Sequence, residues 1–312
     1  MKDSEEVFSS IETLLEALEA NQYITDNSLA TVIYLAYHMK RPLFLEGEPG
    51  VGKTEVALVL SRILGTRLIR LQCYEGLDAA SALYEWNYPK QLLRIRMEEQ
   101  CRKHPDEIGQ VIYTEPYLIK RPLLEAIQSS EEKSPVLLID ELDRADEEFE
   151  AFLLEILSDF QISIPEIGTL KATHRPMVVL TSNRTREVHE ALKRRCLYHW
   201  IDYPDPEKEM RILRARVPGI QETLAAQVVR FIERLRGEDF FKRPGISETL
   251  DWVEALVKLN RYHLDPPTVE QTLGCLLKYR EDIQRFRLGI WADPLEQARL
   301  LQPNLTSGQA EG

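Results

Sequence analysis

Residues 43–54 read LFLEGEPGVGKT and decide the fold of this chain. The apolar run at the start is typical of a buried parallel strand. The residues from Gly47 onward match the phosphate-loop pattern GxxxxGK[ST] in full, after a strand and opening a helix expected at 53–64. The members of the pattern are Gly47, Glu48, Pro49, Gly50, Val51, Gly52, Lys53 and Thr54. The stretch therefore predicts a strand, an anion-binding loop and a helix in succession.

Each part of this loop has a chemical reason to be there. Glycines allow backbone N–H groups to curl around an anion without interference from a Cβ atom. The start of the following helix adds a dipole that favours phosphate. Lys53 supplies a point charge for the outer phosphates, and the hydroxyl of Thr54 is a ligand for Mg²⁺. We expect ATP and Mg²⁺ to bind here. The alternative, a chance match at a strand–helix turn, is disfavoured because the surrounding pattern fits.

A second apolar run, VLLIDE at 136–141, ends in two carboxylates. In phosphate-loop enzymes the aspartate of this pattern holds Mg²⁺, which is the role expected for Asp140. An acid directly after it can take a proton from the attacking water, which is the role expected for Glu141. The alternative is an acidic helix cap. The acids that come after the pair, Asp143 among them, are expected in the first turn of the next helix, where its dipole favours them.

The rest of the pattern predicts an α/β fold. Strands are expected at 67–72, 135–139, 177–181 and 197–201, with helices at 146–158 and 187–193. This alternation indicates a parallel sheet covered by helices on both faces. After 204 only helical patterns occur, at 206–216, 220–236, 246–260 and 267–286. We therefore expect a nucleotide-binding core with N-terminal helices and insertions at 1–204, a small helical lid domain at 205–287 and a flexible tail at 288–312.

Composition narrows the class of protein. The chain has 312 residues and a net charge of −12. Nucleic-acid binding is not expected, because phosphate neutralisation requires a basic surplus. No apolar run is long enough for a membrane span, and the acidic N-terminus does not suggest a signal peptide. The cysteines are Cys73, Cys101, Cys196 and Cys275. No two of them have the CxxC spacing that would indicate zinc or redox chemistry, and they fit a reducing cytoplasm. Cys73 and Cys196 are expected to be buried.

With these residues placed, the chain resembles AAA+ ATPases and, within them, the MoxR family. LIDELDRA at 138–145 is similar to the family pattern around DEINRA, and FLLEIL at 152–157 to its LLEAM helix. The likeness spans roughly 25–285. Residues 136–164 further resemble the CoxD-like subgroup, which is associated with carbon monoxide dehydrogenase maturation.

The resemblance implies a cytoplasmic chaperone-like ATPase that forms a homo-oligomeric ring, expected to be a hexamer, and works with a von Willebrand factor A domain protein. Its client would be a metalloenzyme, a molybdenum hydroxylase whose metal centre it helps to mature. Three alternatives stay open: an activase of another enzyme, a nucleic-acid motor, and a scaffold that binds ATP without turnover.

The resemblance also implies further site residues. Asn183, after the strand at 177–181, matches the sensor-one position, where an amide orients the attacking water; a turn-forming asparagine is the alternative. Arg195 aligns best with the arginine finger that reaches a neighbouring subunit's nucleotide, and Arg194 is the second candidate. A surface basic cluster at a helix end is the competing interpretation.

One departure from the family concerns the sensor-two arginine. Thr249 stands where that arginine is expected, and Arg243 is out of register. Two interpretations stay open: the γ-phosphate is coordinated differently, or hydrolysis is slow without a partner. Arg144 is a candidate substitute, with an ordinary salt bridge as the alternative.

Two further segments resemble insertions of this AAA+ clade. Residues 161–175 predict a hairpin before the sensor-one strand. The segment after Gly76 resembles the helix-two insertion. Its aromatic residues either face the pore or a partner, or pack locally; they are Tyr84, Trp86 and Tyr88.

Overall fold

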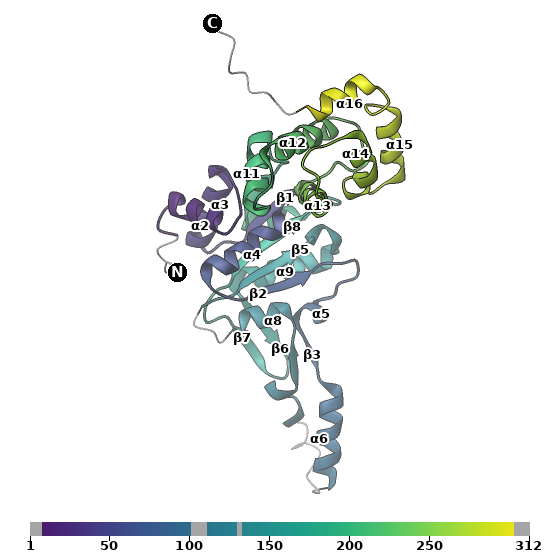
Figure 1. The fold of residues 1–312 in the computed structure, drawn as a ribbon. Helices are drawn as coiled ribbons and strands as arrows, with labels where there is room; N and C mark the ends of the chain where they lie inside the picture. The colour runs from purple at the N-terminus through teal and green to yellow at the C-terminus, as the bar shows by residue number, and fades with distance from the viewer. Residues whose placement is uncertain (1–7, 101–110, 130–132, 303–312) are drawn as a thin grey trace. The chain divides into compact units, whose positions relative to one another are not determined.

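The computed structural model describes residues 8–100, 111–129 and 133–302 (Figure 1). The chain divides into two compact units. The first comprises residues 1–21, 26–47 and 53–200, and the second comprises 22–25, 48–52 and 201–312.

The first unit is built on a five-stranded sheet with the order β2-β5-β8-β1-β9. Its strands are β1 (Leu43–Gly47), β2 (Leu68–Gln72), β5 (Val136–Asp140), β8 (Met177–Ser182) and β9 (Leu197–Ile201). The pairs β2–β5, β5–β8 and β8–β1 are parallel. The carboxyl ends of β1, β5 and β8 therefore meet at one edge of the sheet. The predicted α/β fold with a parallel sheet is confirmed.

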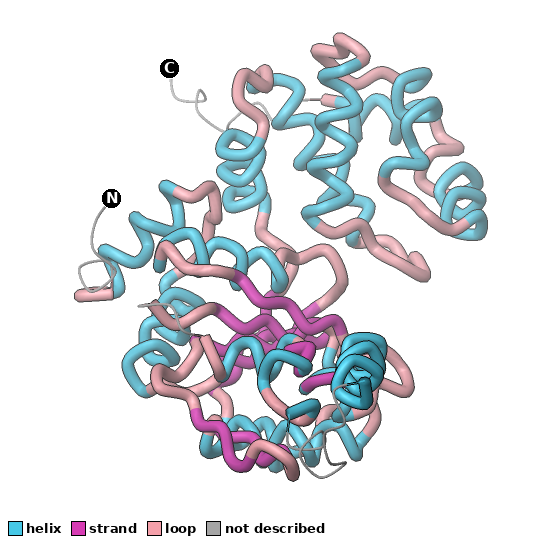
Figure 2. The backbone as a smooth tube through the Cα atoms, turned by 90° about the horizontal axis from the view of Figure 1, so that it is seen from below, coloured by secondary structure: helices cyan, strands magenta, loops and turns pink. Residues whose placement is uncertain are grey.

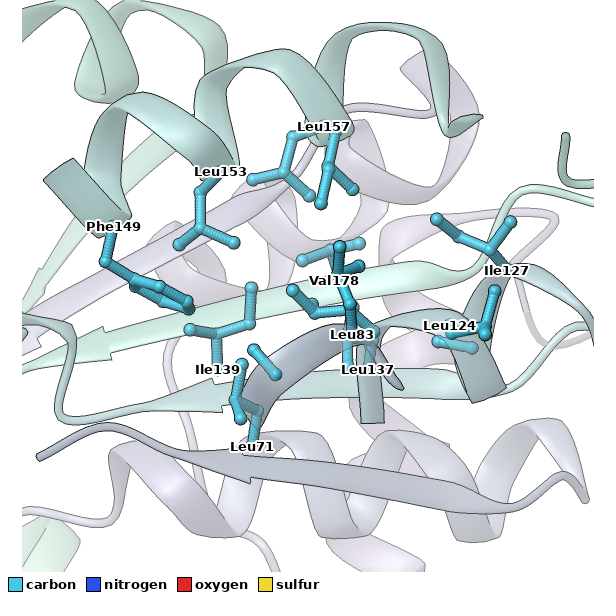
Figure 3. Close-up of a cluster of buried hydrophobic side chains, with 14 of the residues drawn as sticks. Leu71, Leu83, Leu124, Ile127, Leu137, Ile139, Phe149, Leu153, Leu157 and Val178 are labelled. Carbon is cyan, nitrogen blue, oxygen red and sulfur yellow. The ribbon is translucent and has the colours of Figure 1, made fainter. Parts of the chain in front are cut away.

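Helices cover this sheet. They are α2 (Ile11–Ala20), α3 (Asn27–Met39), α4 (Lys53–Leu64), α8 (Pro122–Ile127), α9 (Glu147–Asp159) and α10 (Glu190–Arg195). Helix α9 begins where Asp146 accepts a hydrogen bond from the backbone N–H of Phe149, and its first turn is acidic, as the dipole favours. Figure 3 shows its apolar face: Phe149, Leu153 and Leu157 lie over Ile139, Leu137 and Val178 of the sheet. Burial of these side chains fixes the strand that ends in Asp140.

Two small antiparallel pairs stand apart from the main sheet. The hairpin predicted at 161–175 is confirmed as β6 (Gln161–Ile164) paired with β7 (Gly168–Lys171). The insertion comprises α5 (Ala79–Leu83), β3 (Tyr84–Trp86), α6 (Tyr88–Gln100), the 3₁₀ turn η1 (Glu115–Tyr117) and β4 (Leu118–Lys120), with β3 and β4 antiparallel. Helix α6 reaches away from the sheet (Figure 1). Trp86 is buried edge-on against Tyr113, so it packs locally, whereas Tyr88 is exposed.

After strand β9, residues 202–302 of the second unit form only helices and loops (Figure 2). The helices are α11 (Pro206–Arg216), α12 (Glu222–Arg236), α13 (Ile246–Lys258), α14 (Pro266–Thr272), the 3₁₀ turn η3 (Leu273–Cys275), α15 (Arg280–Leu288) and α16 (Pro294–Leu301). Asp205 caps α11 ahead of Pro206, which suits the first helical position. The core of this unit is aromatic, with Phe231 against Trp252, Phe286 and Trp291.

Two expectations for this region are wrong. The single helix expected at 267–286 ends at Thr272 and resumes at Arg280. The apolar residues between them are buried in the core rather than spaced on one helical face, and Gly274 weakens the helix. Residues 294–301, expected in a flexible tail, form α16, because Asp293 caps the helix and Leu300 is buried. Residues 303–312 lie outside the described part of the chain.

Candidate nucleotide-binding site

The phosphate loop joins β1 to α4, as the motif predicts. Gly50 and Gly52 have φ values of 81° and 97°, a region that residues with a Cβ atom rarely adopt. Lys53 is the first residue of α4, and its Nζ donates to the carbonyl oxygen of Gly47 at 2.7 Å. The ammonium is thus held against the loop. Residues 48–52 group with the second unit, where Ser247 Oγ donates to the carbonyl of Gly50 at 3.0 Å.

Three donors converge on the buried carboxylate of Asp140. The hydroxyls of Thr54 and Thr181 donate to Oδ1 at 3.0 Å and 2.5 Å. On the other side, Arg70 Nη2 donates to Oδ2 at 2.5 Å, although the Arg70 side chain is 53% exposed. A buried carboxylate is costly unless it is paired and hydrogen-bonded. These contacts therefore fix the orientation of the Asp140 carboxylate next to Thr54.

Glu141 has a left-handed backbone with φ 54°, which is uncommon for a residue with a side chain. Its backbone N–H donates to Thr181 Oγ1 at 3.0 Å. The same hydroxyl that donates to Asp140 thus holds the next residue in its strained turn. The carboxylate of Glu141 is part-exposed and forms an ion pair with Arg144 at 3.1 Å. Strain of this kind, held by surrounding contacts, is typical of functional sites.

We expect Thr181→Val to destabilise the protein by about 1–3 kcal/mol, because the nearly isosteric side chain leaves the N–H of Glu141 and one lone pair of Asp140 without their partner. Urea unfolding measures the change. Thr31→Val is the matched control, since Thr31 donates only to the carbonyl of Asn27 in its own helix; it is expected to change stability by about 0.5 kcal/mol or less. Equal costs for both variants would contradict a bridging role for Thr181.

Asp143 anchors the loop that carries Asn183. Its carboxylate accepts from the backbone N–H groups of Asn183 and Thr185 at 3.1 Å and 2.9 Å, and from Thr185 Oγ1 at 2.6 Å. The expectation that Asp143 lies in the first turn of the next helix is wrong, because it belongs to a separate 3₁₀ turn, η2 (Leu142–Arg144). The turn brings its side chain to the end of β8, so Asn183 is positioned through its backbone.

The two candidate finger arginines end helix α10, with different environments. The Arg194 side chain is 74% exposed and pairs with Glu190 one turn earlier at 2.6 Å. Arg195 donates to the carbonyl of Leu154 and to Ser158 Oγ, both on α9 of its own chain. The Arg194 side chain can therefore leave its exposed ion pair with little loss of free energy. Arg195 instead links α10 to α9 through hydrogen bonds.

The position at which the resemblance places a sensor-two arginine holds a buried threonine in the helical unit. Thr249 Oγ1 donates to Glu209 Oε1 at 3.1 Å. Arg236 forms a bidentate ion pair with the same carboxylate, at 2.7 Å and 2.8 Å. Burial raises the pKa of Glu209, and the guanidinium of Arg236 opposes this shift. Thr249 is thus part of the interior of this unit and presents no cation. Arg243 is exposed, and Arg144 forms the salt bridge with Glu141 that was the alternative interpretation.

Cys73 and Cys196 are buried, as expected. Burial, together with the charge of Asp140, raises the pKa of Cys73 to about 12. Burial likewise raises the pKa of Cys196 to about 12. Both thiols are therefore protonated near neutral pH, and neither supplies a nucleophile. Cys101 lies outside the described residues.

The donor set fits Mg²⁺. Thr54 and Asp140 offer hard oxygen ligands 3.0 Å apart at the helix N-terminus, which suits a magnesium ion shared with phosphates. Within the described residues, no group of three or more histidine, cysteine or acidic side chains could hold a metal on its own. In the same part of the chain, no helix has both the length and the apolarity needed to cross a bilayer.

A sheet of this order with a phosphate loop after β1 and a paired acid after β5 defines a phosphate-loop ATPase fold. Residues 42–196 match the family model described as "AAA domain (dynein-related subfamily)". The chain therefore carries an AAA domain and belongs to the AAA+ ATPase family.

Three of the proteins similar to this chain are distant from it in sequence. An uncharacterized protein of Staphylococcus haemolyticus is 27% identical over 77% of this chain and 85% of its own length. Another, of Staphylococcus epidermidis, is 27% identical over 90% of this chain and 97% of its own. The Thermotoga maritima RuvB Holliday junction branch migration motor is 18% identical, over 91% of this chain and 79% of its own, with a TM-score of 0.45.

Proposed function

We propose that this AAA+ protein binds ATP with Mg²⁺ at residues 47–54 and hydrolyses it. The observation that carries the proposal is the convergence of Thr54, Thr181 and Arg70 on the carboxylate of Asp140, next to the strained Glu141. Lys53 would contact the outer phosphates, and Thr54 and Asp140 would hold the magnesium ion, which neutralises charge on the phosphates.

Each of the remaining site residues has a separate role in hydrolysis. Glu141 takes a proton from a water molecule as the water oxygen attacks the γ-phosphorus, and the bond to the bridging oxygen breaks with its electron pair left on ADP. Asn183, whose loop is anchored by Asp143, orients that water. An arginine from a neighbouring subunit, Arg194 or Arg195, stabilises the charge on the transferring group.

The test of nucleotide binding is calorimetry with ATP and magnesium. We expect Lys53→Ala to weaken binding about ten- to a hundredfold, because a charge-assisted contact to the phosphates is lost. Lys258→Ala, which removes an exposed lysine from the helical unit, is the control and is expected to bind normally. No heat from the native protein, or unchanged binding by Lys53→Ala, would refute the proposal.

The resemblance to the MoxR family supports a finer proposal. The protein would act as a chaperone or remodelling ATPase in a hexameric ring, together with a von Willebrand factor A domain partner, in the cytoplasm. Its client would be a molybdenum hydroxylase such as carbon monoxide dehydrogenase, whose metal centre it helps to mature. Activation of another enzyme by the same kind of ring is the second candidate. A nucleic-acid motor is disfavoured by the net charge of −12.

A further inference from the structure

A cavity of 650 Å³ opens at the edge of the sheet opposite the phosphate loop. Its lining comes from the end of α3 and the residues after it, the residues before β5, and the segment between β7 and β8. These are the amino ends of parallel strands, whereas the loop, Asp140 and Asn183 lie at their carboxyl ends. A strand of five residues separates the two edges by about 16 Å. The cavity is thus distinct from the nucleotide site, and its volume is that of a small-molecule site.

The titratable side chains that line this cavity are all basic or neutral. Six of them carry or can carry positive charge around the opening: His38, Lys40, Arg41, Lys133, His174 and Arg175. Within residues 8–100, 111–129 and 133–302, no carboxylate forms an ion pair with any of these six side chains. Glu131 and Glu132 precede Lys133 in the sequence and lie outside those residues. In a chain with a net charge of −12, six such side chains without an acid partner among the described residues are unexpected.

Neutral groups hold three of these cations in position. Arg41 donates to the backbone carbonyls of Arg194 and Cys196 at 2.7 Å and 3.2 Å. Lys133 Nζ donates to the carbonyl of Leu64 at 3.3 Å.

Arg175 lies over the ring of Phe160 at 5.3 Å. Carbonyls and an aromatic ring orient a cation without cancelling its charge. Arg41, Lys133 and Arg175 are therefore held in position and keep their attraction for an anion.

We propose that this cavity binds a small phosphorylated molecule. Clustered ammonium, imidazole and guanidinium donors match the charge and the several acceptor oxygens of phosphate groups. The apolar part of the lining, which includes Ala36, Leu64 and Pro176, accepts the body of such a molecule. The site is independent of the ATP proposal, because it shares no residue with the phosphate loop.

The test is calorimetric titration of the whole protein with inorganic pyrophosphate in metal-free buffer, with ADP at saturation to occupy the phosphate loop. We expect one pyrophosphate per chain, bound about tenfold more weakly by the triple variant Lys40→Gln, His174→Gln and Arg175→Gln, since two exposed charges and an exposed imidazole donor are lost. The control triple Lys258→Gln, Arg261→Gln and His263→Gln removes the same three residue types from exposed positions in the helical unit.

Three results would overturn the proposal: no saturable binding by the native protein, unchanged binding by the first triple variant, or an equal loss in both triples. Malonate serves as a dicarboxylate of small size, and equally tight binding of malonate would overturn the phosphate assignment. All six substituted side chains are exposed, so both variants are expected to fold, with unfolding midpoints like that of the native protein.

Discussion

Replacing Glu141 by glutamine is expected to leave ATP binding intact and to lower turnover by about 10²–10⁴-fold. Glutamine keeps the size of the side chain and its hydrogen-bonding capacity but cannot accept the proton of the attacking water. The backbone contact from Glu141 to Thr181 does not involve the side chain, so the strained turn is expected to persist. Phosphate release under saturating ATP and magnesium measures the effect.

Glu148→Gln is the matched control for this variant. Glu148 is an exposed acid in the first turn of α9, seven residues further along the chain, and the same chemical change there is expected to leave turnover unaltered. Undiminished phosphate release by Glu141→Gln would remove Glu141 from the role of base. Nucleotide binding by the same sample separates this outcome from failure of the ATP proposal itself.

The same variant can identify the client. A ring that holds ATP without hydrolysing it is expected to retain proteins that the native ring releases. Affinity purification of Glu141→Gln should then recover a metalloenzyme and a von Willebrand factor A domain protein, if the MoxR-type proposal is right. Recovery of the same proteins with Lys53→Ala, which is expected to bind ATP about ten- to a hundredfold more weakly, would show that the retention is independent of nucleotide.

The parts of the fold and site that the sequence predicts are those encoded by contiguous residues. The phosphate loop, the acid pair at the end of a buried strand and the hairpin at 161–175 each depend on neighbours within a few positions. The loop motif in particular requires a strand before it and a helix after it, and the structure has both, in β1 and α4. Local pattern was therefore sufficient for these elements.

Contacts between residues far apart in the chain could not be read in the same way. Thr181 joins Asp140 and Glu141 from 41 and 40 positions away, and nothing in its own surroundings indicates this role. Asp143 comes so soon after the acid pair that it resembles a helix cap, yet its partners lie on the loop after β8. Arg70 could have been suspected only from the parallel pairing of β2 with β5, which places Gln72 beside Asp140.

Replacing Arg194 by alanine is expected to lower turnover by about 10³–10⁵-fold, the range attributed to arginine fingers, without changing the unfolding midpoint. The sequence favours Arg195 for this role, but the geometry favours Arg194. The exposed pair of Arg194 with Glu190 contributes about 1 kcal/mol at most, so the guanidinium can leave it for a neighbouring nucleotide. Arg195→Ala is instead expected to lower the midpoint, because two contacts to α9 are lost.

A mixing experiment tests whether the finger acts on a neighbouring subunit. Rings made only of Arg194→Ala chains keep intact phosphate loops, whereas rings made only of Lys53→Ala chains keep intact fingers. If Arg194 acts between subunits, mixed rings bring an intact loop together with an intact finger, and part of the turnover returns. Mixed rings of Arg195→Ala and Lys53→Ala chains should then show no more turnover than the Arg195→Ala chains contribute by themselves. If turnover returned in the mixture with Arg195→Ala and not in the mixture with Arg194→Ala, Arg195 would be the arginine finger. Its guanidinium would then have to leave the carbonyl of Leu154 when subunits assemble.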